Sequence, residues 1–155
     1  MPDLSDLLDR EAILGALKAN SKKKVLQDMS VPASRRTGVP ERQIFETVLQ
    51  RERLGSTGVG NGVAIPHGKL KEVEKLTGVF ARLATPVDFD AIDGEPVDLV
   101  FLLLAPESAG ADHLKALSRI ARAFRDPTRV ERLRAATDPD AILALFADSG
   151  RSQAA

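Results

Sequence analysis

The sequence contains no cysteine, tryptophan or tyrosine, and its aromatic residues are six phenylalanines. Without cysteine the chain can form no disulfide, no thiolate nucleophile and no cysteine-ligated zinc site. Without tryptophan and tyrosine the core must be mainly aliphatic. Any chemistry therefore falls to oxygen- and nitrogen-bearing side chains, among which histidine occurs only twice.

A charge imbalance and a long apolar run are also absent. Lys+Arg and Asp+Glu each count 22, and we expect no nucleic-acid partner because phosphate backbones attract basic surfaces. The longest apolar run, residues 99–105, is far shorter than the roughly 20 residues that span a bilayer, so no membrane insertion is expected. The start MPDLSDLLDR lacks the basic and apolar blocks of a signal peptide, which favours a cytoplasmic protein.

Strand signals lie in the middle of the chain, whose length suits one domain over residues 1–155, with a core over about 7–147. Three segments are predicted to form strands, namely residues 63–65, 77–83 and 97–104. The third is almost continuously apolar, as expected of a central strand covered on both faces. The glycine-rich segment before them, GSTGVGNG, is predicted to be a loop, and residues 10–19 fit either a strand or a helix.

Serine, proline and glycine mark two helices in the N-terminal third. Ser21 suits the cap of a first helix, which we expect to end or kink near Ser30 because Pro32 has no backbone N–H to donate. Pro40 suits the first turn of a second helix, and Gly55 suits its end.

The C-terminal third carries three more helix signals. A helical period begins at Ala111, with an apolar stripe predicted at Leu114, Leu117, Ile120, Ala121 and Phe124. The Asp-Pro pairs at 126–127 and 138–139 each combine a cap with proline at the first helical position, predicting two short helices. The tail GRSQAA is expected to be frayed. The elements together predict an α/β fold with helices over a small sheet.

The densest functional signal is the segment GSTGVGNGVAIPHGK, residues 55–69. Glycine permits close backbone approach, so backbone N–H groups of this loop can converge on an anion. The residues concerned are Ser56, Thr57, Gly58, Gly60, Asn61 and Gly62. The glycine spacing matches neither the dinucleotide motif nor a Walker A loop, so no nucleotide or other organic cofactor is expected.

His67, directly after this segment's short strand, suits a nucleophile that attacks phosphorus. Its imidazole is available in the neutral form near pH 7, since the ordinary pKa is about 6.5. The preceding helix ends near Arg51, whose guanidinium could hold phosphoryl oxygens in a bidentate manner. A histidine after a strand is equally compatible with an ordinary loop residue, and that interpretation stays open at this point.

The second histidine, His113, falls in the first turn of the helix that begins at Ala111. A helix N-terminus favours the neutral ring, so His113 suits a partner for His67 or for its phosphate, or simply a polar residue near a cap. The acidic segment DFDAIDGEPVD lacks the spacing of a calcium loop, because Ile92 interrupts it. We therefore expect a solvated turn there and no metal site.

These residues match a known family. RERLGSTGVGNGVAIPHGKL resembles the active-site signature of phosphotransferase-system enzyme IIA domains of the fructose and mannitol class, and the resemblance continues through FDAIDGEPVDLVFLLLAPE and DHLKALSRIAR. It covers roughly residues 7–146. The segments GNGVAIPHGKL and FDAIDG are most similar to the nitrogen-regulatory branch. The length of the chain favours the same branch, because it leaves no room for a fused IIB, IIC or HPr domain.

The resemblance implies a mixed sheet sandwiched between helices, no metal or organic cofactor, and a phosphohistidine carrier. The family's phosphorylated histidine falls on His67, its active-site arginine on Arg51 and its second histidine on His113. The implied donor is HPr or a similar phosphocarrier, and the implied partners of the regulatory branch are target proteins that distinguish the two phosphorylation states.

Three alternatives remain from the sequence. The first is a sugar-specific IIA component that passes phosphate to a IIB domain. The second is a non-catalytic module that binds an anion or a protein. The third is a metal-dependent hydrolase built from the two histidines and nearby aspartates.

Overall fold

The structure is a computed structural model that describes residues 4–147. Its centre is a six-stranded sheet in the order β1-β5-β6-β3-β2, with β4 pairing to β6 as well. The strands are β1 (Ile13–Leu17), β2 (Gly58–Gly60), β3 (Val63–Ala64), β4 (His67–Leu70), β5 (Thr77–Val87) and β6 (Val97–Pro106). β5 and β6 are antiparallel, whereas β3 and β4 both run parallel to β6. The sheet is therefore mixed, as the sequence resemblance implies.

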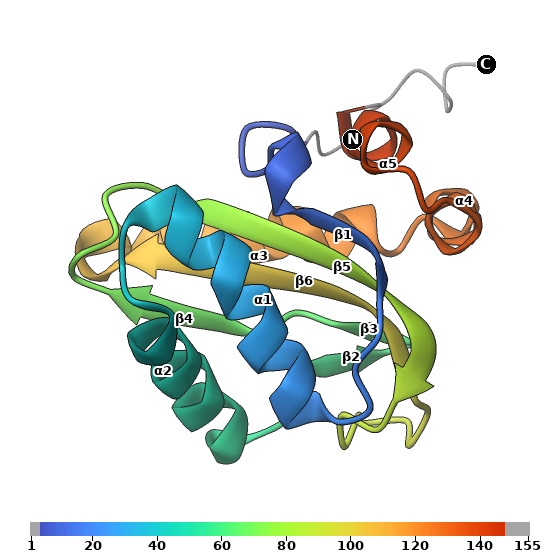
Figure 1. The fold of residues 1–155 in the computed structure, drawn as a ribbon, viewed down its shortest axis with the longest axis horizontal. Helices are drawn as coiled ribbons and strands as arrows, with labels where there is room; N and C mark the ends of the chain where they lie inside the picture. The colour runs from blue at the N-terminus through green and yellow to red at the C-terminus, as the bar shows by residue number, and fades with distance from the viewer. Residues whose placement is uncertain (1–3, 148–155) are drawn as a thin grey trace.

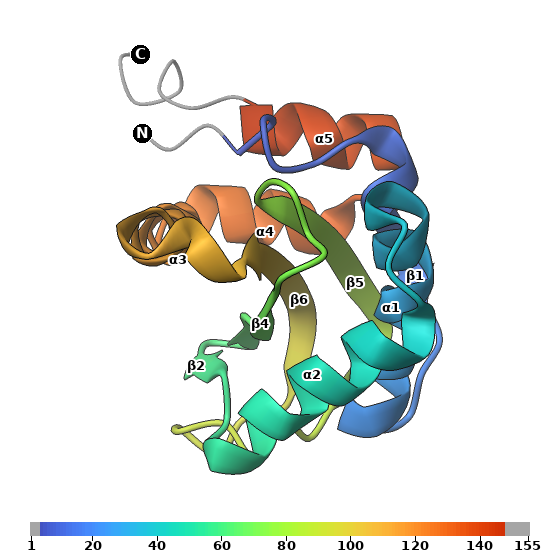
Figure 2. The ribbon, with the colours of Figure 1, turned by 90° about the vertical axis from the view of Figure 1, so that its left-hand side faces the viewer.

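Helices cover both faces of this sheet. The helices are α1 (Lys22–Thr37), α2 (Glu41–Leu54), α3 (Ala111–Ala123), α4 (Pro127–Ala135) and α5 (Pro139–Ala147), with short 3-10 turns at Arg10–Ala12 and Glu107–Ala109. Figures 1 and 2 show α1 and α2 on one face, and α3 and α4 on the other. The predicted α/β fold with a mixed sheet between helices is confirmed.

Strand β6 supplies side chains to two separate cores. Val100, Leu102 and Leu104 join the cluster under α1 and α2, whereas Leu99, Phe101 and Leu103 join the cluster that includes α3, α4 and α5 residues. Successive strand residues point to opposite faces, so both faces of this strand must be apolar. This explains the continuous apolar run and confirms its prediction as a central covered strand.

Helix α1 does not end near Ser30, although that is one of the two outcomes expected from Pro32. The helix continues to Thr37 and stops at Gly38, which has a left-handed φ of 78°. Met29 and Ala33 on either side of the proline are fully buried. Burial of this apolar face outweighs the one backbone hydrogen bond that Pro32 cannot make.

Two local predictions also need correction, and one segment that the sequence left open is assigned. The segment predicted as a loop contains strand β2, which pairs antiparallel with β3. Residues 10–19, left open between strand and helix, contain β1. In α3 the buried positions are His113, Ala116, Ile120 and Ala123, while Leu114 is 69% exposed. The buried stripe is offset because the histidine and two alanines face inward. The tail predicted to be frayed, residues 150–155, lies outside the described residues.

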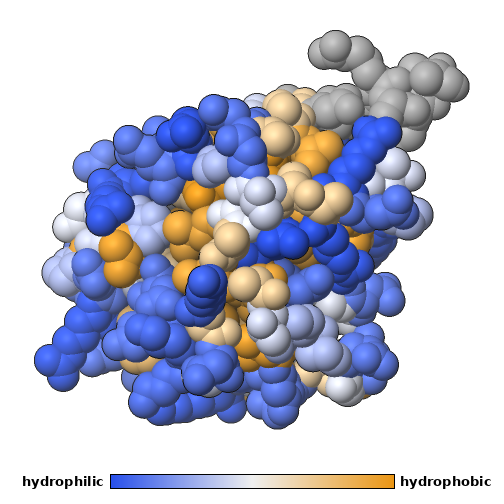
Figure 3. Space-filling view, turned by 45° about the vertical axis from the view of Figure 1, so that its right-hand side comes forward, coloured by the Kyte–Doolittle hydropathy of each residue, from blue (hydrophilic) through white to orange (hydrophobic). Residues whose placement is uncertain are grey.

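The sheet edge formed by β1 carries apolar side chains that are only partly covered. Leu14 and Leu17 pack against the core from this strand without being fully buried. Figure 3 shows apolar side chains in a broken band on this side of the molecule, interrupted by hydrophilic ones. A short edge strand flanked by hydrophilic side chains limits edge-to-edge pairing with other chains.

Gly15 in β1 has no room for a side chain. A Cβ atom there would lie 1.8 Å from the carbonyl oxygen of Thr137, in the connection between α4 and α5. We expect Gly15→Ala to destabilise the protein by about 1–3 kcal/mol, because the backbone must move apart. Urea denaturation measures this effect. Gly55→Ala is the control, because a Cβ at Gly55 meets nothing within 4 Å; equal stability of the two variants would contradict the account.

Candidate active site

His67 is the first residue of β4 and lies opposite Leu103 of β6 in a parallel register. Its ring is half-buried, and Nδ1 lies 2.9 Å from the carbonyl oxygen of Ile65. A carbonyl oxygen can only accept a hydrogen bond, so Nδ1 must carry the proton. In the neutral ring the lone pair therefore resides on Nε2, which makes Nε2 the nucleophilic atom.

The surroundings of His67 favour this neutral ring. Burial lowers the pKa of His67 below its ordinary value, and the positive charge of Arg51 lowers it further. The hydrogen bond to Ile65 and the charge of Glu52 act in the opposite direction without reversing the shift. An imidazole with a lowered pKa is largely deprotonated near pH 7 and keeps its Nε2 lone pair available.

His113 lies next to His67 across the gap between α3 and β4. The two rings meet edge to face, with centroids 5.5 Å apart and an interplanar angle of 86°. His113 is 5% exposed, and within residues 4–147 neither of its ring nitrogens has a hydrogen-bond partner. Burial, and then the charges of His67 and Lys69, lower the pKa of His113. A buried polar ring without a partner is costly, so it marks this position as a functional candidate.

Arg51 lies in the last turn of α2 and faces the loop that follows. Its Nη1 donates a hydrogen bond of 3.0 Å to the carbonyl oxygen of Gly55. Its charge lowers the pKa of His67, so the guanidinium is within electrostatic reach of the imidazole. A guanidinium has five N–H donors, and the bond to Gly55 leaves others available for phosphoryl oxygens.

Backbone N–H groups of the glycine-rich segment between α2 and β3 donate to side-chain oxygens of the segment itself and of its neighbours. The N–H of Gly58 donates to Ser56 Oγ at 3.0 Å, and the N–H of Asn61 donates to Asp93 at 3.0 Å. The N–H of Thr57 donates to Glu52 at 3.2 Å. These amides already have partners, so binding an anion through them would require exchange of these bonds. Gly60 and Gly62, with positive φ of 101° and 80°, form the turn between β2 and β3.

Sequence reasoning missed the residues that fix this loop. Glu52 is only 4% exposed and accepts hydrogen bonds from Thr57 and from Lys22 of α1. On the other side of the loop, Arg134 of α4 contacts Asp98 at 2.9 Å and the carbonyl oxygen of Asn61 at 2.5 Å. The only sequence signal for Glu52 is an acid that follows Arg51 immediately before a glycine-rich loop.

Two further observations concern the described residues as a set. In residues 4–147 no three His, Cys, Asp or Glu side chains are grouped so that they could hold a metal ion. No helix in the same part of the chain is both long and apolar enough to cross a membrane.

The lowered pKa values of the two histidines predict a pH dependence of stability. Between those lowered values and about 6.5, the unfolded chain binds more protons than the folded protein, so folding weakens as the pH falls. Above about pH 6.5 the free energy of unfolding should not depend on these two histidines, and below about pH 6.5 it should decrease. Urea denaturation across this range measures the slope, and His113→Gln should flatten it. If the stability of the wild-type protein rose as the pH fell through this range, the two rings could not be buried in their neutral form.

Comparison with known proteins identifies the family. Residues 6–149 match the family described as "Phosphoenolpyruvate-dependent sugar phosphotransferase system, EIIA 2". The chain belongs to this family of phosphoryl carriers. A nitrogen regulatory protein of Bradyrhizobium diazoefficiens is 60% identical over 144 residues, which is 93% of this chain and 94% of that protein. Within the family the similarity is thus to nitrogen regulatory members.

Solved structures agree with this assignment. The nitrogen regulatory protein IIA-Ntr of Neisseria meningitidis superposes with a TM-score of 0.88 at 37% identity, covering 92% of this chain and 98% of that one. Mannitol enzyme IIA of Escherichia coli, in a complex with phosphorylated enzyme IIB, gives a TM-score of 0.79 at 26% identity, with 92% and 98% covered. Both the sheet and its covering helices are therefore those of an enzyme IIA.

Proposed function

We propose that the chain is a cytoplasmic phosphohistidine carrier that accepts a phosphoryl group on Nε2 of His67 from a HPr-like phosphocarrier protein. The observation that carries this proposal is the contact between His67 Nδ1 and the Ile65 carbonyl, which fixes the proton on Nδ1 and leaves Nε2 as the nucleophile. Membership of the phosphotransferase-system family supports the choice of phosphorus as the atom attacked.

In the proposed transfer, the Nε2 lone pair attacks the phosphorus of the donor phosphohistidine in line. The new Nε2–P bond forms as the N–P bond of the donor breaks, and the donor ring leaves with that electron pair. The proton on Nδ1 stays in place, and the Ile65 carbonyl stabilises the positive charge that develops on the ring. No separate base is required.

Arg51 and His113 have distinct proposed roles in this step. The guanidinium of Arg51 binds the equatorial oxygens, which carry the charge during transfer. His113, whose two ring nitrogens have no partner among residues 4–147, hydrogen-bonds the phosphoryl group or the phosphorylated ring. Ser56, Thr57, Gly58, Gly60, Asn61 and Gly62 are proposed to line the phosphate side of the site.

Exposed apolar side chains near these elements provide a docking surface for the donor. Among the described residues the large apolar side chains that are exposed are Leu54, Val59, Ile92 and Leu114. Leu54 ends α2, Val59 lies in β2 and Leu114 follows His113 in α3. Exposed apolar groups close to a reactive residue are typical of protein contact sites. Val63 and Ile65, which follow Val59 in the sequence, are buried in the core and do not belong to this surface.

Phosphorylation would then act as the regulatory signal. A phosphoryl group adds close to two negative charges at pH 7 to a site bordered by exposed apolar side chains. Target proteins can distinguish the two states through this change. The 60% identity to a protein named nitrogen regulatory protein favours such regulatory targets over transfer to a sugar-specific IIB domain.

The proposal is tested by intact mass measurement after incubation with phosphoenolpyruvate, enzyme I and a HPr-like carrier. We expect the mass of one phosphoryl group to be added, and to be lost in acid but not in base. If an active carrier adds nothing, the chain is a non-catalytic binding module.

A further inference from the structure

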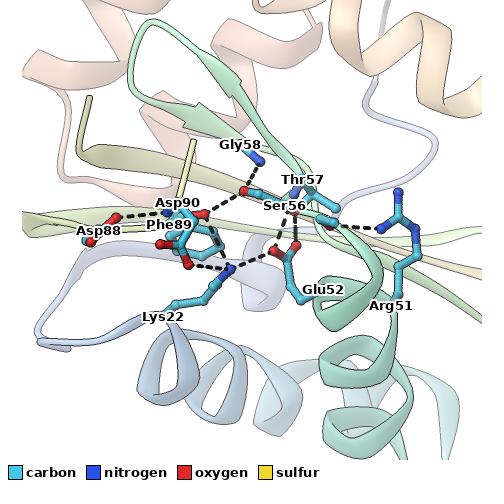
Figure 4. A network of polar contacts seen from close by, with 10 residues as sticks. Lys22, Arg51, Glu52, Ser56, Thr57, Gly58, Asp88, Phe89 and Asp90 are labelled. Carbon is cyan, nitrogen blue, oxygen red and sulfur yellow. Dashed lines mark hydrogen bonds and ion pairs between the residues drawn. The ribbon is translucent and has the colours of Figure 1, made fainter. Parts of the chain in front are cut away.

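A buried charged network joins α1, the end of α2 and the glycine-rich loop (Figure 4). Lys22 Nζ lies 3.0 Å from Glu52 Oε2 and 3.3 Å from the carbonyl oxygen of Phe89. Both the N–H and the hydroxyl of Thr57 donate to the Glu52 carboxylate. Ser56 Oγ donates to the same Phe89 carbonyl at 2.5 Å. Two segments distant in sequence thus hold one short loop.

Stability alone is a poor reason for this arrangement. The side chain of Glu52 is 1% exposed and that of Lys22 is 20% exposed, so both charges lose most of their hydration. The desolvation penalty of a buried ion pair offsets much of its attraction, and apolar replacements are often equally stable. The location of the pair, directly after Arg51, points to a role in the site instead.

Arg51 and Glu52 hold successive parts of the same loop. Arg51 donates to the carbonyl oxygen of Gly55, and Glu52 accepts from Thr57 two residues further on. Moving the Glu52 carboxylate would therefore displace the loop and release the helix end that carries Arg51.

We propose that Glu52, neutralised by Lys22, is a positioning residue that holds Arg51 and the loop in the geometry required for phosphoryl transfer to His67. This inference rests on the proposed function. It assigns to Glu52 no contact with the phosphoryl group. The negative charge of Glu52 also acts on the ring of His67, where it raises the pKa against the lowering effects of burial and Arg51.

The test compares Glu52→Gln with Glu46→Gln in phosphoryl transfer from the HPr-like carrier. Glu46 lies on the same helix, but its ion pair with Arg42 is exposed, and its ion pair and hydrogen bond are to Arg42 and not to the loop. For Glu52→Gln we expect kcat to fall by about 10²-fold with little change in KM, because the docking surface is intact while the reacting groups are misplaced. Glu46→Gln should behave as wild type.

A second readout does not depend on transfer. The pKa of His67, measured by NMR titration, should fall further in Glu52→Gln and stay unchanged in Glu46→Gln. If Glu52→Gln does not fold, Lys22→Met/Glu52→Gln removes both charges, and the same two changes are expected in it. Wild-type kcat in Glu52→Gln would overturn the positioning role, whatever the pKa of His67, and would leave the proposed function standing. Absence of phosphorylation in the wild-type protein would overturn both.

Discussion

His67→Ala is expected to abolish phosphoryl acceptance while leaving the fold intact. The substitution removes the proposed nucleophile, Nε2 of a ring whose Nδ1 donates to the carbonyl oxygen of Ile65. The fold should survive, because this half-buried ring makes one hydrogen bond to the backbone of its own segment. Intact mass after incubation with the phosphorylated carrier measures acceptance, and circular dichroism measures folding.

His113→Ala is the matched control, because His113 is the only other histidine in the chain. It touches the same site, with its ring centroid 5.5 Å from that of His67. We expect slower but detectable acceptance, since the nucleophile remains. The opposite pattern, with acceptance in His67→Ala and none in His113→Ala, would reverse the assignment of the two rings.

Arg51→Ala is expected to slow transfer by about 10²–10³-fold, the range found when one donor to a developing charge is removed. The variant should also raise the pKa of His67, because the charge of Arg51 lowers it. Arg51→Lys keeps the charge but not the planar fork, so it should restore the pKa more fully than the rate. Single-turnover transfer and NMR titration measure the two effects. A wild-type rate in Arg51→Ala would exclude it from phosphate binding.

Much of the fold could be predicted because the local signals agree with the tertiary contacts. The carboxylate of Asp126 accepts from the N–H of Thr128 at 3.0 Å, and that of Asp138 accepts from Ala141 at 2.9 Å. Both are the caps expected from an Asp-Pro pair. β6 could be predicted for a similar reason, since both of its faces are buried and its sequence is apolar throughout.

The parts that could not be predicted depend on pairing between distant segments. β4 begins with His67 and Gly68, which carry no strand signal of their own, and it exists because it pairs with β6 at Leu103 and Leu104. A central strand can thus impose extended structure on a weak neighbour.

In the candidate site, too, some residues could be predicted from local sequence and others depend on contacts between distant segments. Arg51 and His67 are proposed as site residues from residue type and motif. The role proposed for Glu52 could not be predicted in this way, because it depends on the fold bringing Lys22, thirty residues away in sequence, to its carboxylate. A local pattern of apolar residues also cannot foresee that His113 faces inward while Leu114 is exposed.

The central claim is that Nε2 of His67 forms the bond to phosphorus. Long-range ¹H–¹⁵N NMR of the phosphorylated protein, labelled with ¹⁵N, tests this most directly, because the phosphorylated ring nitrogen differs from the protonated one in chemical shift. The structure predicts phosphorus on Nε2 of His67, with the proton retained on Nδ1 beside the Ile65 carbonyl. A phosphoryl group on Nδ1 of His67, or on either nitrogen of His113, would contradict it.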